Sequence, residues 1–278
     1  MGAGPFFRGD MTLTHPPLPK SFKNAFPFRL AAPSYVYPGD YALNIRLLGP
    51  FVDEIEILLF ESLTENALPS PDAFAEMARL SRKFGLTLNV HLPIDVSLAH
   101  PDPNMRKTAV KQLVRAMDAA SVLDPTSMTL HIDCHEKDLS RPGVKKWRKR
   151  VDAGLQRLLD AGTKAETLCV ETLDYPFEII EDTVLSHGLS VCLDLGHLAL
   201  YGRDIEKAFD RMGSRVRVVH LHGVRDGRDH LSLDQMDKAL LERVVARLKG
   251  FSGSLCLETF SYEKLKRSLE TFEKAWGT

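Results

Sequence analysis

The chain has 278 residues and a formal net charge of -1 at pH 7, with a pI near 6.8. This length fits one barrel or two smaller domains, and the near-neutral charge provides no basic field of the kind that drives binding to duplex nucleic acid. No stretch of the sequence is long and apolar enough to span a bilayer, which argues against a membrane-embedded protein.

The first 25 residues are rich in proline and glycine and lack the charged and apolar regions of a secretory signal. Met-Gly at the start resembles a myristoylation signal, but Phe6 stands where serine or threonine is required. We therefore expect residues 1–25 to form a flexible lead-in, with Met11 as an alternative start, and residues 26–278 to form one domain.

From residue 28 onward, strand-like segments rich in β-branched and aromatic residues alternate with segments of helical periodicity. The predicted strands are 28–38, 52–62, 86–93, 127–135, 167–175, 189–197, 216–224 and 254–260. The predicted helices are 69–85, 104–123, 143–162, 176–188, 204–213, 233–251 and 262–276. The weakest step of the alternation is segment 44–51, which is short and contains a proline.

This alternation predicts a parallel sheet that is covered by helices on its outside. Eight such units in about 250 residues favour a closed (β/α)8 barrel. A doubly wound open sheet is the alternative, but no GxGxxG turn follows the first predicted strand. The alternation contains no domain boundary.

Ionisable side chains stand at or near the ends of the third to eighth predicted strands. Burying such a group costs several kcal/mol unless it is paired or bound to a metal. In a (β/α)8 barrel the carboxyl ends of the strands line one mouth, so these residues should meet there. Imidazoles and carboxylates suit Zn, Mn or Fe, and the sequence therefore predicts a metalloenzyme. The residues are His91, His131, Glu171, Asp194, His197, His220, His222 and Glu258.

The four cysteines lie within the apolar segments, and none belongs to a CxxC pair. We expect them to be small buried hydrophobic side chains and not disulfides or thiolate ligands, which fits a reducing cytoplasm. They are Cys134, Cys169, Cys192 and Cys256. Three glutamates around the second strand, Glu54, Glu56 and Glu61, are expected to be solvated or hydrogen-bonded.

The order His, His, Glu, Asp-x-x-His, His, Glu on these strands resembles the xylose-isomerase-like superfamily of TIM barrels, which includes endonuclease IV, sugar epimerases and inosose dehydratases. The resemblance covers about residues 28–275. It implies a central metal ion and, as in endonuclease IV-like members, a second ion at two histidines. The implied central ligands are Glu171, Asp194, His220 and Glu258, and the implied second pair is His91 and His131.

Endonuclease IV-like members bind a third ion with a histidine matching His197 and with an Asp-x-His on the loop after strand seven. In this chain the loop reads DGRDHL, so that Arg228 occupies the position of the aspartate and Asp229 precedes His230. The resemblance thus implies one to three divalent ions and leaves open whether Asp229 and His230 are ligands.

Two chemistries compete for this mouth. A sugar isomerase or epimerase needs one ion to hold vicinal oxygens, and Glu171 and Glu258 could move the proton. A phosphodiesterase favours additional imidazoles and arginines near the phosphate, which His91, His131, His197 and His230 and the loop residues Arg225 and Arg228 provide. We therefore favour phosphodiester hydrolysis. Tyr35 and Tyr37 at the end of the first strand either belong to the core or form a stacking wall for the substrate.

Segments 26–62, 90–98 and 218–233 are also similar to the cobamide-remodelling phosphodiesterases. This resemblance implies hydrolysis of the nucleotide loop of a cobamide, which releases cobinamide and α-ribazole phosphate in corrinoid salvage. The alternatives are a sugar isomerase or epimerase with one divalent metal, and a corrinoid-binding protein without catalysis. Cleavage of abasic DNA is disfavoured, because contacts with duplex phosphates need clustered Lys and Arg.

Overall fold

The structure, a computed structural model, describes residues 15–134, 136 and 141–277. Eight parallel strands close into a barrel in the order β1, β10, β7, β6, β5, β4, β3, β2. The predicted (β/α)8 TIM barrel is confirmed. The barrel strands are β1 (Arg29–Pro33), β2 (Glu54–Leu58), β3 (Thr87–His91), β4 (Met128–Leu130), β5 (Leu168–Glu171), β6 (Ser190–Asp194), β7 (Val216–Leu221) and β10 (Ser254–Leu257).

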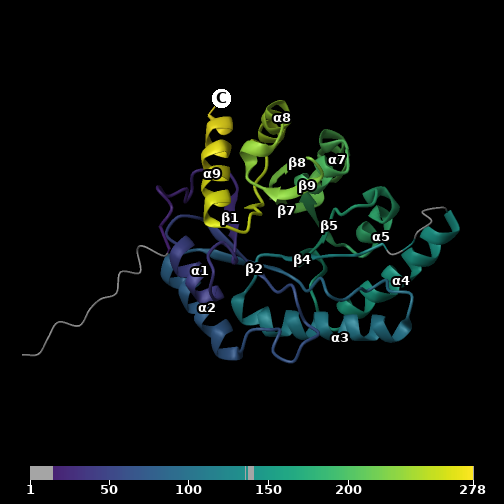
Figure 1. The fold of residues 1–278 in the computed structure, drawn as a ribbon. Coiled ribbons are helices and arrows are strands. Elements are labelled where there is room, and N and C mark those ends of the chain that lie inside the picture. Colours follow the sequence, from purple (N-terminus) through teal and green to yellow (C-terminus); the bar gives the residue numbers. More distant parts are fainter. Residues whose placement is uncertain (1–14, 135, 137–140, 278) are drawn as a thin grey trace, which may run out of the picture.

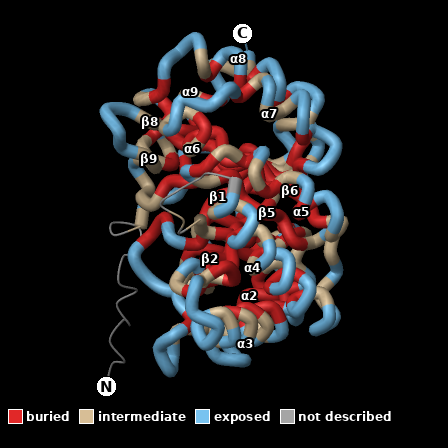
Figure 2. The backbone as a smooth tube through the Cα atoms, turned by 90° about the vertical axis from the view of Figure 1, so that its right-hand side faces the viewer, coloured by how far each residue is buried: buried red, intermediate tan, exposed pale blue. Residues whose placement is uncertain are grey.

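Helices surround the barrel on its outside (Figure 1). Buried residues lie mainly in the strands, and exposed residues lie on the outer faces of the helices (Figure 2). No helix in the described part of the chain has both the length and the apolar character of a membrane span. The helices are α1 (Tyr41–Leu48), α2 (Pro71–Phe84), α3 (Pro103–Ala120), α4 (Arg141–Asp160), α5 (Glu181–Ser186), α6 (Leu195–Leu200), α7 (Ile205–Met212), α8 (Lys238–Leu248) and α9 (Tyr262–Trp276).

The connection between β1 and β2 is also helical, although the sequence pattern there was weak. The Asp40 side chain caps α1 by accepting a hydrogen bond from the Leu43 N–H at 2.7 Å. Ile45 and Leu48 on this helix are fully buried. The cap and the burial of these two apolar side chains stabilise the helix although it is short. Pro50 lies beyond its last residue and does not interrupt it.

All eight barrel strands end before the predicted carboxyl ends, and after the sixth and the seventh the remaining residues begin a different element. The sixth ends at Asp194, whose side chain accepts from the His197 N–H at 2.7 Å and begins α6. The seventh ends at Leu221 and is followed by an antiparallel hairpin of β8 (Gly223–Arg225) and β9 (Arg228–Leu231). His197 therefore lies on α6 and His230 on β9, both at the mouth of the barrel.

Part of the expected lead-in belongs to the folded barrel. Leu18 and Phe22 are buried in the hydrophobic core, and the Tyr37 hydroxyl donates to the Pro16 carbonyl at 2.6 Å. The expectation of a flexible segment up to residue 25 is therefore wrong for residues 15–25, because their apolar side chains have partners on the barrel. Residues 1–14, with Met11, lie outside the described residues.

A buried carboxylate closes the amino-terminal end of the barrel interior. Glu54 is fully buried on β2, and five side chains donate hydrogen bonds to it. A carboxylate with this many donors is stable away from water, so Glu54 has a structural role far from the mouth. The donors are Arg29 at 3.2 Å, Thr87 at 2.9 Å, Asn89 at 2.9 Å, Thr126 at 2.6 Å and Ser254.

Candidate metal centre

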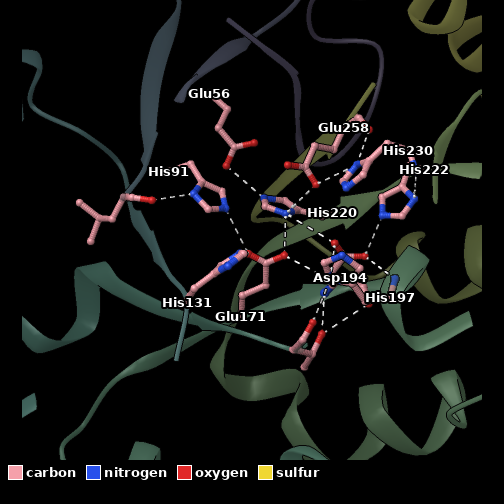
Figure 3. A network of polar contacts seen from close by, with 12 residues as sticks. Glu56, His91, His131, Glu171, Asp194, His197, His220, His222, His230 and Glu258 are labelled. Carbon is pink, nitrogen blue, oxygen red and sulfur yellow. Dashed lines mark hydrogen bonds and ion pairs between the residues drawn. The ribbon is translucent and has the colours of Figure 1, made fainter. Parts of the chain in front are cut away.

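Every histidine, aspartate and glutamate predicted to bind metal lies at the carboxyl-terminal mouth of the barrel. In Figure 3 their rings and carboxylates point toward one another. Their donor atoms form groups whose members lie within 4.8 Å of one another; some of these groups share Glu171, and the group of His197, His222 and His230 is separate. The predicted residues are His91 on β3, His131 after β4, Glu171 on β5, Asp194 on β6, His197 on α6, His220 on β7, His230 on β9 and Glu258 after β10.

The central group consists of Glu171, Asp194, His220 and Glu258, all buried. The Nδ1 atom of His220 lies 3.3 Å from the Glu258 Oε2 atom, 3.5 Å from the Glu171 Oε1 atom and 3.9 Å from the Asp194 Oδ2 atom. His220 Nδ1, Asp194 Oδ2 and Glu258 Oε2 are buried and have no hydrogen-bond partner. Such atoms are costly to bury unless a cation satisfies them. One imidazole and three carboxylates around a shared point fit a divalent ion such as Zn, Mn or Fe.

A second group shares the Glu171 carboxylate. The Nε2 atoms of His131 and His91 lie 2.8 and 3.2 Å from the Glu171 Oε2 atom. The Nδ1–H of His91 donates to the Leu92 carbonyl at 2.9 Å, which directs the Nε2 atom into the group. Because the two oxygens of Glu171 face different groups, this carboxylate could bridge two ions.

The third group consists of His197, His222 and His230. The Nδ1 atoms of His197 and His230 each lie 3.2 Å from a backbone carbonyl, that of Thr172 and that of Glu258 respectively. Each of these rings therefore presents its Nε2 atom to the group. The third member is His222, which follows β7. The resemblance to endonuclease IV implied an aspartate from the loop after strand seven in its place.

His222 was left without a role by the sequence, and the structure places its ring beside His197 and His230, with its Nε2 atom 3.3 Å from the Asp194 Oδ1 atom. A Cβ atom on Gly196 would lie 2.0 Å from the His222 Cε1 atom. Only glycine in α6 leaves room for this ring. The His230 N–H donates to the His222 Nδ1 atom at 3.0 Å, and His230 adopts a left-handed φ of 46°. The hairpin thus holds the two rings against each other, with centroids 4.3 Å apart.

Glu56 is a residue of the site that the sequence analysis did not assign to it. It lies inside the barrel on β2 and is fully buried, as is His220. Its Oε1 atom accepts a hydrogen bond from the His220 Nε2–H at 3.0 Å. This contact selects the tautomer with the Nδ1 lone pair directed at the central group. A signal was present in the sequence, because Glu54 and Glu56 alternate within an otherwise apolar strand.

The buried charges perturb one another strongly. Burial alone would raise the pKa of Glu171, but His131 and His220 hold this pKa well below its usual value. Burial likewise opposes ionisation of Glu258, and His220 nevertheless lowers its pKa. Burial would lower the pKa of His220, but Cys192, Glu56, Glu258 and Glu171 raise it well above its usual value. The centre is therefore rich in negative charge, which either protonated imidazoles or a divalent cation would balance.

Three cysteines lie in the barrel wall beside this centre. Cys169, Cys192 and Cys256 are buried and free, while Cys134 is only partly buried. Burial raises the pKa of the Cys192 thiol well above its usual range, which favours the neutral thiol. The expectation of buried apolar cysteines is correct for these three, although the Cys192 sulfur lies close enough to Glu171 and His220 to join a metal group.

The predicted substrate-binding residues separate into two classes. Tyr37 is buried in the hydrophobic core, in agreement with its interpretation as a core residue. Tyr35 is exposed beyond the end of β1. Arg225 and Arg228 are exposed on the hairpin that carries His230, and the Arg225 Nη1 atom donates to the Gln235 Oε1 atom at 3.3 Å. These three residues remain available to a ligand at the mouth.

Comparison with known proteins agrees with this architecture. A model of the xylose isomerase-like TIM barrel family matches residues 50–275. Probable endonuclease 4 of Mycobacterium ulcerans (strain Agy99) is 28% identical over 193 residues, which cover 63% of this chain and 73% of that protein.

Solved structures with different activities share the fold. Endonuclease IV from Thermus thermophilus superposes with a TM-score of 0.70 and 22% identity, covering 90% of this chain and 99% of that chain. A D-tagatose 3-epimerase-like protein superposes with a TM-score of 0.71 and 18% identity, covering 90% of this chain and 97% of that chain. At these identities the likeness concerns the fold and not the reaction. The family match over residues 50–275 is more specific, and the chain belongs to the xylose isomerase-like TIM barrel family.

Proposed function

We propose that the protein is a metal-dependent phosphodiesterase and that its substrate is a cobamide, which it cleaves in the nucleotide loop to cobinamide and α-ribazole phosphate. The observation that carries the reaction class is the presence of two imidazole-rich groups beside the central carboxylate group. A sugar isomerase or epimerase with one ion needs only the central group. The additional histidines suit a centre with more than one ion, which stabilises both the attacking and the leaving oxygen of a phosphodiester.

The charge of the glutamates fits a metal-binding role. Neighbouring histidines lower the pKa of Glu171 and the pKa of Glu258, so both carboxylates are ionised and can bind a divalent ion. Both candidate reactions use such ligands, and the choice between them rests on the additional histidines.

A divalent ion bound here supplies Lewis-acid chemistry, since it lowers the pKa of water and offsets negative charge on phosphate oxygens. The protein contributes the positions of its ligands and the orientation of the substrate. Glu56 orients His220, and Leu92 orients His91. The guanidinium of Arg228 is proposed to bind a phosphate oxygen by charge-assisted hydrogen bonds, with Arg225 beside it on the hairpin.

The cobamide assignment rests on segments 26–62, 90–98 and 218–233 and on their resemblance to cobamide-remodelling phosphodiesterases. The test is incubation of metal-free protein with a cobamide and Zn, Mn or Fe(II), followed by chromatography for cobinamide and α-ribazole phosphate. Glu258→Gln serves as the inactive control. Release of both products supports the proposal.

Assays of the same metal-loaded protein with a ketohexose and with an abasic duplex separate the alternatives. Epimerisation of a ketohexose without cobamide cleavage would identify a sugar epimerase. This function is the second candidate because the barrel is shared with an epimerase-like protein and the central group is complete. Tight binding of a cobamide without release of products under any metal would identify a corrinoid-binding protein. Cleavage of an abasic duplex in preference to cobamides would overturn the small-molecule assignment.

A further inference from the structure

Exposed apolar side chains occur on the loops that follow three neighbouring strands at the mouth. Tyr35 after β1 is 65% exposed, Leu63 after β2 is 49% exposed and Ile94 after β3 is 41% exposed. The strands β1, β2 and β3 are adjacent in the barrel. Single exposed hydrophobic residues are ordinary, but their recurrence on successive loops around an active mouth suggests a binding surface. We call Tyr35, Phe60, Leu63 and Ile94 the apolar rim.

The backbone of the apolar rim is fixed by hydrogen bonds between loops. The Ile94 N–H donates to the Phe60 carbonyl at 3.0 Å. The Asp95 carboxylate accepts from the Ser62 N–H at 2.7 Å and from the Leu63 N–H at 2.9 Å. The exposed side chains of Leu63 and Ile94 therefore stand on an ordered base, and a ligand that covers them loses little entropy in ordering the loops.

The apolar rim continues into the metal centre. The Phe60 ring packs edge-on against the His91 ring, with centroids 5.0 Å apart. It also contacts Phe260 at 6.3 Å, and the Phe260 ring lies 4.9 Å from the His230 ring. Apolar surface thus reaches both the second and the third ligand group. A phosphate held at these groups would place one of its substituents over the rim.

The charge of the rim excludes a polyanionic substituent. Residues 34–40, 59–70 and 92–102 contain no lysine or arginine, and they include Glu61, Glu65 and other acidic residues. The candidate phosphate-binding arginines lie on the hairpin after β7, on the other side of β10 and β1 in the barrel order. A nucleic-acid strand carries phosphates on both sides of the scissile bond and needs cations along its path.

We propose that the apolar rim binds an apolar face of the bulky substituent of a phosphodiester whose phosphate lies at the metal centre. This inference rests on the proposed phosphodiesterase activity. It defines the substrate class as a diester with one large substituent that presents an apolar face, and it assigns Leu63, Ile94 and Tyr35 as residues that determine specificity. A nucleic-acid strand is the competing occupant.

The test compares two diesters with the same leaving group, methyl 4-nitrophenyl phosphate and 2-naphthylmethyl 4-nitrophenyl phosphate. The metal-loaded wild type should prefer the naphthylmethyl diester by about tenfold or more in kcat/KM, the expected effect of covering one large apolar group. Leu63→Ser combined with Ile94→Ser should remove most of this preference. The matched control is Val122→Ser, because Val122 is 53% exposed in the short helical turn before β4. It should keep the preference.

A preference that survives the double substitution would overturn the inference, and so would an equal loss of activity on both diesters. Failure to hydrolyse either diester would contradict the proposed phosphodiesterase activity instead. In that case calorimetry with 2-naphthylmethyl phosphate and methyl phosphate tests whether the apolar rim binds an apolar group, independently of catalysis. Equal affinity of the wild type for the two monoesters would overturn the inference, as would tighter binding of an oligothymidylate that depends on Leu63 and Ile94.

Discussion

The Glu56 Oε1 atom lies 3.0 Å from the Nε2 atom of His220, on the side of the ring opposite the central ligand group. Both side chains are fully buried. A neutral imidazole has one donor nitrogen and one acceptor nitrogen, so a carboxylate at Nε2 makes that atom the donor. The Nδ1 lone pair then faces Glu171, Asp194 and Glu258. Glu56 thereby prepares His220 to be a ligand without belonging to the ligand group itself.

Replacing Glu56 with Gln should weaken metal binding at the central group by about 10- to 100-fold, the usual effect of losing an outer carboxylate. The barrel should stay folded, because the amide has nearly the same shape. Titration against a chelating dye measures the affinity. Glu61→Gln is the matched control, since Glu61 is exposed at the end of the same strand region. An unchanged affinity in Glu56→Gln would show that its contact with His220 is only structural.

The shared position of Glu171 predicts that its loss is more severe than the loss of Glu258. Glu171 belongs to both the central and the second group of the described residues. Glu258 belongs to the central group and not to the second. Glu171→Gln should lower metal content at both groups and abolish turnover, and Glu258→Gln should abolish turnover with a smaller loss of metal. Elemental analysis with exposed Glu166→Gln as control measures the difference. Normal metal content and rate in both variants would refute the metal-centre assignment.

The close approach of Gly196 to His222 predicts a selective effect on the third group. Gly196→Ala places a methyl group where the His222 ring lies, so this ring must move. We expect the variant to lose metal bound at the third group while the central group stays occupied. Cobalt(II) substitution followed by absorption spectroscopy distinguishes the sites. Gly213→Ala is the control, because a Cβ atom there meets nothing within 4 Å. Identical spectra for Gly196→Ala and wild type would contradict the expectation.

Arg228 and His230 lie on the same strand of the hairpin and should respond differently to substitution. Loss of a charge-assisted hydrogen bond to phosphate costs about 1.5–3 kcal/mol, so Arg228→Ala should lower kcat/KM for a phosphodiester by about 10- to 100-fold at unchanged metal content. His230→Ala should lower both. Arg215→Ala, at the other end of the barrel, is the control. If the kinetics of Arg228→Ala match those of the wild type, Arg228 is an exposed residue without a role in phosphodiester hydrolysis.

The raised pKa values of buried histidines predict opposite pH responses without and with metal. Burial would lower the pKa of His91, but Glu171, Glu56 and Glu258 raise it, and the pKa of His220 is also raised. A raised folded-state pKa stabilises the metal-free protein below about pH 6.5, and this stabilisation is lost as pH rises through the folded-state pKa. The Tm of chelator-treated protein should therefore fall between pH 6 and pH 9.

Metal affinity should rise over the same pH range, because the imidazoles must release their protons to bind an ion. Thermal unfolding with and without stoichiometric metal at several pH values measures both trends. A metal-free Tm that is constant from pH 6 to pH 9 would indicate that these histidines are neutral without metal. The charge balance of the centre would then need another explanation.

The sequence alone determined the barrel and most of the metal centre. Apolar β-branched strands alternating with amphipathic helices have few stable packings, and eight such units close on themselves. A polar residue at the end of each apolar strand is costly unless it has a partner, so its position already marks the mouth. For this reason the sequence places His91, Glu171 and Asp194 together at the mouth.

Only the tertiary structure decided the features that depend on distance between elements. The roles of Glu54 and Glu56 differ because one meets hydroxyl and amide donors and the other meets His220, although both point inward from β2. His222 enters the third group because Gly196 on another element leaves space for it. Leu18 joins the core because the barrel offers it an apolar surface. Local sequence encodes periodicity and caps, whereas these contacts arise when distant segments pack against one another.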